Sequence, residues 1–167
     1  KKQTTLFDEK YRLNYSITEL ADEIEKIKNP IIRECLKFLS IDDRLYISTM
    51  SDVPASTGLG SSSSFTVGLA HALYAYTNKF VSSSRLAKDA SFLEIETLKE
   101  PIGKQDQYAA SFGGLNIIRF FRTGEVEVVP VILEKNFYNK LQDNLLLFYT
   151  GTVRSASDVL SDQKNNL

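Results

Sequence analysis

The sequence predicts an α+β fold with a mixed, largely antiparallel sheet, and three observations support this prediction. Segments typical of strands and of helices follow one another without the strict alternation that a parallel βα sheet requires. Residues 115–121 and 125–129 are rich in β-branched and aromatic side chains, and the connecting Arg122-Thr123-Gly124 is typical of a hairpin. Residues 45–50 resemble a further strand, which leads through a glycine- and serine-rich loop into a helix.

The first segments of the chain predict one strand and two helices. Residues 10–16 alternate polar and apolar side chains, as a strand does. The next apolar residues follow at helical spacing and predict a helix that Asn29-Pro30 would end: Ile17, Leu20, Ile24 and Ile27. Pro30 suits the first position of a second helix, which we expect to run to about Leu39. Cys35 on that helix is interpreted as core filler, because nothing near it in the sequence would activate its thiol.

Three helices are predicted after the glycine- and serine-rich loop. The first is expected to end near Asn78, and the second spans about residues 82–98, with serines at its start that suit an N-cap. Pro101 and Gly103 break the helical pattern before a short third helix over residues 105–111.

The segments that follow the hairpin predict two further helices with a buried strand between them. Residues 136–141 are weakly helical, and the apolar run 145–150 is predicted to form a fully buried strand. A final helix is expected from Ser155 onward.

The composition excludes several classes of protein. With 20 basic and 21 acidic side chains the net charge is −1, so no electrostatic argument supports binding to nucleic acid or to an anionic membrane. No apolar run reaches membrane-spanning length. Cys35 is the only cysteine, which excludes an internal disulfide and suits a reducing cytoplasm. His71 is the only histidine, and it is expected to be an ordinary helix residue.

The glycine- and serine-rich loop, residues 52–64, has the features of an anion-binding site. Gly58 and Gly60 allow positive φ and a close approach of the backbone to a ligand. The first N–H groups of the following helix and the hydroxyls of residues 61–64 could bind phosphate oxygens or a metal. The plainer alternative is that the serines only cap the helix. Neither the P-loop pattern nor the dinucleotide pattern is present.

A second group of charged residues follows between Glu94 and Tyr108. Phosphoryl transfer to a hydroxyl needs a bound cation and a group that receives or orients the hydroxyl proton. Glu94, with a serine of the loop, could hold Mg²⁺, and Glu96 is a rival candidate. Asp106 follows the Pro101 and Gly103 break, where a helix start could direct it into a cleft.

Three segments of the chain resemble one known family. Residues 54–63, PASTGLGSSS, resemble the central ATP-binding motif of the GHMP kinases. Residues 105–108, QDQY, are similar to a segment of the sugar-kinase branch of that family, particularly of the kinases that act on D-glycero-D-manno-heptose 7-phosphate, with the L-fucokinases second. Residues 149–154, YTGTVR, are similar as well, so the resemblance extends from about residue 45 to the end of the chain.

This resemblance implies a fold, a reaction and a set of site residues. The fold would be the GHMP N-terminal domain, which is ribosomal protein S5 domain 2-like, and the cofactors would be ATP and Mg²⁺. Asp106 would be the catalytic base or orienting carboxylate, while Ser62 and Glu94 would bind Mg²⁺. The ATP phosphates would be wrapped by Pro54, Ala55, Ser56, Thr57, Gly58, Leu59, Gly60, Ser61, Ser62 and Ser63.

The resemblance also implies a substrate. We expect ATP-dependent phosphorylation of a sugar phosphate, at the anomeric hydroxyl of D-glycero-D-manno-heptose 7-phosphate. An L-fucokinase-like or other GHMP small-molecule kinase, and a non-catalytic sensor of sugar and nucleotide, are the alternatives. Lys104, Gln105 and Arg154 are the candidate substrate residues, although Lys104 and Arg154 could equally be solvated surface cations. The oligomeric state is left open, with a homodimer as one alternative.

The same resemblance implies a domain organisation. Residues 1–150 would form most of an N-terminal, ATP-binding domain that is incomplete at its start, and residues 151–167 would begin a C-terminal domain. A kinase of this family is expected to be roughly twice as long, so the 167 residues alone are expected to be inactive.

Overall fold

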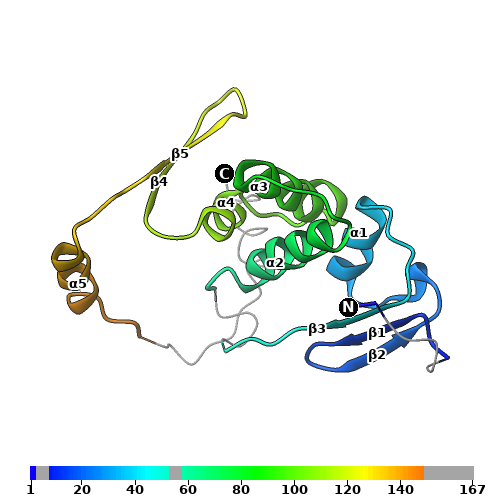
Figure 1. Ribbon diagram of the computed structural model, residues 1–167. Helices are drawn as coiled ribbons and strands as arrows, with labels where there is room; N and C mark the ends of the chain where they lie inside the picture. Colours follow the sequence, from blue (N-terminus) through cyan, green and yellow to red (C-terminus); the bar gives the residue numbers. More distant parts are fainter. Residues whose placement is uncertain (3–7, 53–57, 149–167) are drawn as a thin grey trace.

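The computed structural model describes residues 1–2, 8–52 and 58–148, which form an α+β fold (Figure 1). The elements in chain order are β1 (Tyr11–Asn14), β2 (Thr18–Ala21), the 3-10 turn η1 (Ile24–Lys26), α1 (Pro30–Phe38), β3 (Leu45–Ser48), α2 (Ser61–Tyr76), α3 (Ser83–Ser91), the π-helical η2 (Phe92–Thr97), α4 (Gln105–Phe112), β4 (Asn116–Phe120), β5 (Val126–Pro130) and α5 (Lys135–Asp143).

The strands form two small sheets. The first has the order β2-β1-β3, in which β2 pairs antiparallel with β1 and β3 pairs parallel with β1. The parallel pair arises because α1 lies between β1 and β3 in the chain and serves as their crossover. The second sheet is the β4–β5 hairpin, with Ile118 opposite Val128. The prediction of a mixed, largely antiparallel arrangement is therefore confirmed.

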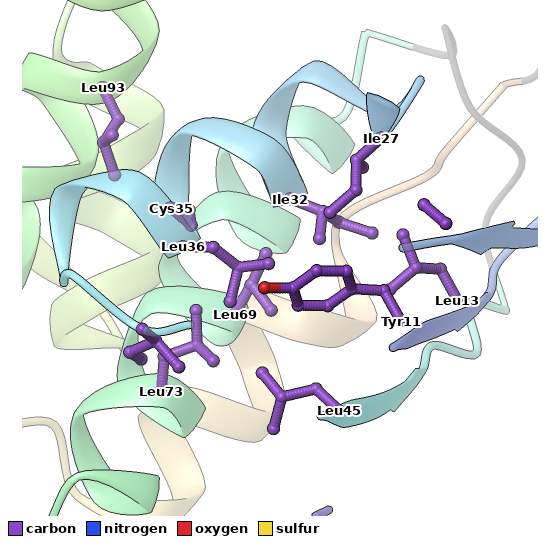
Figure 2. Close-up of a cluster of buried hydrophobic side chains, with 12 residues drawn as sticks. Tyr11, Leu13, Ile27, Ile32, Cys35, Leu36, Leu45, Leu69, Leu73 and Leu93 are labelled. Carbon is purple, nitrogen blue, oxygen red and sulfur yellow. The ribbon is translucent and has the colours of Figure 1, made fainter. Parts of the chain in front are cut away.

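The main hydrophobic core lies between the first sheet and helices α1 and α2 (Figure 2). Tyr11 and Leu13 point inward from β1 because alternate strand residues face the same side. Fully or almost fully buried side chains from the other elements meet them there: Ile32, Cys35, Leu36, Leu45, Leu69, Leu73 and Leu93. The prediction that Cys35 is a core residue is confirmed, since it is 1% exposed.

Helices α2, α3 and α4 pack against one another beside this core (Figure 1). Val67 and Ala70 of α2 contact Leu86 and Ala90 of α3 in a second apolar cluster. The side chain of Ser82 caps α3 by accepting a hydrogen bond of 3.3 Å from Arg85 N, as the serine pattern predicted. Helix α3 continues directly into the π-helical η2, which carries Glu94.

The helix predicted over residues 17–27 is wrong. Residues 18–21 form β2 instead, and only the short turn η1 is helical. The inward-facing positions of β2 are Glu19 and Ala21, whereas Ile17 and Leu20 are more than half exposed. Glu19 is stabilised in its buried position by hydrogen bonds from Lys28 N, Asn29 N and the hydroxyl of Tyr15. The buried face of β2 carries a carboxylate and a small residue instead of large apolar side chains. The spacing of the apolar residues therefore indicated a helix where the chain forms a strand.

The buried strand predicted over residues 145–150 is also wrong where the structure describes it. Residues 145–148 follow α5 without regular structure, and their four side chains are 66–83% exposed. They follow α5 at the lower left of Figure 1, away from helices α1–α4 and from the first sheet. An apolar run becomes a strand only where a neighbouring strand pairs with it, and composition does not supply that neighbour.

No helix within the described part of the chain is both long and apolar enough to cross a bilayer.

Candidate active site

The start of α2 presents backbone N–H groups that have no acceptor within the described residues. Gly58 and Gly60 have φ of +76° and +67°, and Gly60 is the N-cap residue of α2. The first helical hydrogen bond is from Ser64 N to Gly60 O at 2.9 Å, so the amides of Ser61 to Ser63 have no acceptor within the helix. No side chain of the described residues caps this end. The serines therefore do not act as a cap here, and the positive end of the helix dipole faces outward.

The hydroxyl of Ser62 instead joins α2 to the π-helical η2. Ser62 Oγ donates a hydrogen bond of 2.8 Å to Glu94 Oε1. The other carboxylate oxygen, Glu94 Oε2, accepts a hydrogen bond of 2.5 Å from Gln107 Nε2 of α4. The side chains of Glu94 and Gln107 are both 0% exposed, so three elements meet at one buried carboxylate.

The contacts of Glu94 fit a magnesium ligand. No Lys or Arg of the described residues forms an ion pair with Glu94, and a buried carboxylate with only neutral donors is stabilised by a cation. Ser62 Oγ and Glu94 Oε1 lie 2.8 Å apart, and hydroxyl and carboxylate oxygens are the hard ligands that Mg²⁺ prefers. Among the described residues no group of three or more His, Cys, Asp or Glu could hold a metal, so phosphate and water would complete the ligand set.

The rival acid, Glu96, lies elsewhere. Its side chain is 63% exposed, and one of its oxygens lies 3.9 Å from Lys99 Nζ. Glu94 is therefore the acid that contacts the loop serines, and Glu96 belongs to the solvated face of η2.

Asp106 lies against Gly60 of the loop. A β-carbon built on Gly60 would be 3.3 Å from Asp106 Cγ and 3.4 Å from Asp106 Oδ2. Asp106 is in the first turn of α4, and none of the described side chains caps that helix start. The starts of α2 and α4 therefore meet at an exposed carboxylate.

The other predicted residues lie around this point or outside the described chain. Lys104 is the exposed N-cap residue of α4, two positions before Asp106. The side chain of Gln105 is also exposed and lies against Gly103 rather than toward Glu94. The predicted phosphate-binding residues 54–57 and the predicted substrate residue Arg154 lie outside the described residues.

The negative charge of Glu94 also affects the pKa of Cys35 in the core. Burial, together with the smaller effect of the negative charges of Glu94 and Glu34, raises the pKa of the Cys35 thiol to about 12. Cys35 is therefore a protonated, unreactive thiol at neutral pH. His71 is exposed on α2, so neither residue contributes a reactive group to this site.

Gln107 is the residue of this site that the sequence did not single out. Gln105 was chosen from the same motif, but α4 turns Gln107 and Tyr108 inward and leaves Gln105 outside. The pairing with Glu94 depends on packing between α4 and η2 and has no sequence signal.

Comparison with known proteins finds relatives among the sugar kinases. The chain is 34% identical over 147 residues to the D-glycero-alpha-D-manno-heptose 7-phosphate kinase of Campylobacter jejuni, a match that covers 87% of this chain and 42% of that protein. It is 30% identical over 118 residues to the bifunctional fucokinase/GDP-fucose pyrophosphorylase of Arabidopsis thaliana, covering 70% of this chain and 11% of that protein. The chain thus spans less than half the length of either relative.

A solved structure and a family model identify the fold. The crystal structure of a D-glycero-D-manno-heptose 1-phosphate kinase from Bacteriodes thetaiotaomicron superposes with a TM-score of 0.75 at 22% identity, covering 84% of this chain and 49% of that one. The family model described as "GHMP kinases N terminal domain" matches residues 27–114, a range that includes Gly60, Glu94 and Asp106. The chain therefore belongs to the GHMP kinase family, of which it carries the N-terminal domain.

Proposed function

We propose that this chain is the ATP-binding part of a kinase that transfers the γ-phosphoryl group of ATP to a hydroxyl of a sugar phosphate. The observation that carries the proposal is the meeting of three features at the start of α2. These are the uncapped amides of residues 61–63, the Ser62–Glu94 pair and the carboxylate of Asp106 beside Gly60. Together they supply an anion-binding surface, a cation ligand set and a proton acceptor within one small region.

The backbone and serines would hold the nucleotide. The uncapped amides of α2 donate hydrogen bonds to phosphate oxygens, and the positive φ of Gly58 and Gly60 lets the chain approach them closely. The predicted loop residues 54–57 would continue this surface around the phosphates. Ser62 and Glu94 would hold Mg²⁺, which when bound neutralises the charge of the phosphates.

Asp106 would orient the acceptor hydroxyl. Its carboxylate accepts a hydrogen bond from that hydroxyl and receives the proton as the hydroxyl oxygen forms its bond to the γ-phosphorus. The bond between the γ-phosphorus and the bridging oxygen then breaks, and ADP leaves with the electron pair. Because Asp106 lies against Gly60, the proton acceptor and the phosphate-binding backbone are held at a fixed separation.

The sugar is proposed from the relatives. The most extensive match above is to a heptose 7-phosphate kinase, so we propose the anomeric hydroxyl of D-glycero-D-manno-heptose 7-phosphate as the acceptor. Lys104, Gln105 and Arg154 would anchor the phosphate that this substrate already carries. An L-fucokinase-like activity on a free sugar is the second candidate, supported by the match to the fucokinase of Arabidopsis thaliana.

The domain proposal follows the same comparison. Residues 1–150 would supply most of the N-terminal domain, and residues 151–167 would begin the C-terminal domain. A cytoplasmic location fits both the ATP dependence of the reaction and the free thiol of Cys35.

The test is a phosphorylation assay of the full-length protein with ATP, Mg²⁺ and a panel of sugars and sugar phosphates. Heptose 7-phosphate should give the highest kcat/KM, with the new phosphate on the anomeric carbon by ³¹P NMR. Faster turnover of free fucose would favour the second candidate. ATP binding without transfer to any sugar would favour a non-catalytic sensor.

A further inference from the structure

We propose that Gln107 is a positioning residue that orients the carboxylate of Glu94 for the metal ion. The inference rests on the proposed function, in which Glu94 and Ser62 hold Mg²⁺. It goes further by assigning a role to a side chain that reaches neither the nucleotide nor the sugar.

The hydrogen bonds around Glu94 divide its two oxygens between two partners. Oε1 accepts from Ser62 Oγ on the loop side, and Oε2 accepts from Gln107 Nε2 on the α4 side. A carboxylate without a second partner could rotate about its last torsion and present either oxygen. Because Gln107 occupies Oε2 at 2.5 Å, the carboxylate is held with Oε1 toward Ser62.

The amide orientation of Gln107 is set by charge. An ionised carboxylate only accepts hydrogen bonds, so the NH₂ end of the amide must face Glu94. The other end, Gln107 Oε1, is buried and has no hydrogen-bond partner within the described residues. An unpaired buried acceptor costs free energy, which the hydrogen bond from Gln107 Nε2 to the buried carboxylate offsets. The one hydrogen bond that this side chain makes within the described residues is thus the one that orients Glu94.

The position of Gln107 also links the two acidic groups of the site. It follows Asp106 directly, so one turn of α4 carries the side chain that lies against Gly60 and the side chain that holds Glu94. The next residue, Tyr108, is buried and packs on the rings of Phe112 and Phe120 at centroid distances of 6.3 and 6.0 Å. This aromatic contact fixes the start of α4 relative to β4.

The experiment measures metal binding separately from catalysis. Mn²⁺ is titrated by EPR into the full-length protein saturated with a non-hydrolysable ATP analogue, for the wild type and for Gln107→Met, which keeps the length and most of the volume. We expect Gln107→Met to weaken Mn²⁺ binding about 10–100-fold, the usual effect of removing a group that orients a metal ligand. Affinity for the analogue in EDTA should be unchanged, because Gln107 touches no phosphate-binding group.

Two further variants separate this role from a structural one. Ser91→Ala removes another buried hydrogen bond on α3, from Ser91 Oγ to Ala87 O at 2.7 Å, and should leave the Mn²⁺ midpoint unchanged. Gln107→Asn keeps the amide but shortens its reach, so it should weaken Mn²⁺ binding as well. It provides the same measurement if the Met variant does not fold.

A double-mutant cycle with Glu94→Gln decides between the possible failures. If Gln107 acts through Glu94, Gln107→Met should have no further effect on Mn²⁺ binding in the Glu94→Gln background. If Glu94→Gln itself leaves the Mn²⁺ midpoint unchanged, the metal assignment in the proposed function is wrong. If Glu94→Gln shifts the midpoint and neither Gln107 variant does, only the positioning role is overturned.

Discussion

The α-carbon of Gly60 faces the carboxyl group of Asp106 so closely that a β-carbon on Gly60 would lie 3.3 Å from Asp106 Cγ. Gly60 is at once the N-cap of α2 and a residue with φ of +67°. The helix start that would receive phosphate and the carboxylate that would receive the proton are therefore separated by the bare backbone of one glycine.

Gly60→Ala tests this contact. The added methyl group forces a strained φ, which costs about 1–2 kcal/mol of stability, and displaces Asp106 by a few tenths of an ångström. We expect kcat to fall about tenfold or more, since small displacements of reacting groups have large effects.

Two other glycines are the controls. Gly58→Ala introduces similar backbone strain with nothing within 4 Å of its β-carbon, so its loss of stability should be smaller. Gly68→Ala in α2, also with no contact, should be stabilising by about 0.5–1 kcal/mol and leave kcat unchanged. Equal effects of Gly60→Ala and Gly58→Ala would argue against the contact.

Asp106→Asn should lower kcat by about 100-fold or more, because an amide cannot accept the hydroxyl proton. The Kd for ATP, measured by calorimetry, should change by less than about twofold, since Asp106 acts mainly in the transition state. Asp143→Asn, at an exposed position of α5, is the matched control and should leave both values unchanged. A kcat of Asp106→Asn close to that of the wild type would remove Asp106 from the catalytic role.

Glu94→Gln should raise the Mg²⁺ concentration needed for half-maximal activity by at least about tenfold. Removing a group that merely orients a metal ligand already lowers metal affinity about 10–100-fold, so removing the ligand itself should cost at least as much. Glu96→Gln makes the same chemical change on an exposed carboxylate that lies 3.9 Å from Lys99, and should leave the Mg²⁺ dependence unchanged. The reverse result would assign the metal to Glu96.

Arg154→Ala should raise the KM for the sugar phosphate about 10–100-fold, the effect of losing a charge-assisted hydrogen bond to phosphate. The KM for ATP should change little. Lys104→Ala tests the second candidate anchor, and Lys99→Ala, which removes an exposed lysine beside Glu96, is the control. If free and phosphorylated sugars are used equally well by the wild type, neither cation anchors a substrate phosphate.

Stability should fall as the pH rises above about 9. Burial raises the pKa of Cys35 to about 12 in the fold, from its ordinary value of 9.0, so the thiol loses its proton more readily in the unfolded chain. The unfolded state then binds fewer protons across this window, and the free energy of unfolding decreases by at most about 1.4 kcal/mol per pH unit for one group. Tyr15, whose pKa burial and the hydrogen bond to Glu19 raise to about 12, adds to the loss at higher pH. Urea unfolding of Cys35→Ala at pH 7 to 10.5 should show a smaller slope; an unchanged slope would contradict the assignment.

The sequence predicted the local features of this site better than the contacts across it. The positive φ of Gly60, the helix start after the loop and the short helix carrying Asp106 all follow from glycine, serine and proline placement, which acts over a few residues. The Gln107–Glu94 pair joins helices that are close only after packing, so no spacing indicates it.

The errors elsewhere have the same origin. β2 buries Glu19, which is tolerated only because two backbone amides and the hydroxyl of Tyr15 satisfy its oxygens. The apolar run at residues 145–148 has strand composition, but composition does not specify a pairing partner. Both outcomes depend on tertiary context rather than on local propensity.

The π-helical turn at Phe92–Thr97 makes the length of this segment as important as its chemistry. An α-helix advances about 100° per residue, so deleting one residue from the wide turn would rotate everything after it by about that angle. Leu98 and the link to α4 would then leave in a new direction, and Asp106 and Gln107 would arrive out of phase with Gly60 and Glu94. The number of residues between Ser91 and Gln105 is therefore itself a structural constraint, because deleting any one of them would change the orientation of α4.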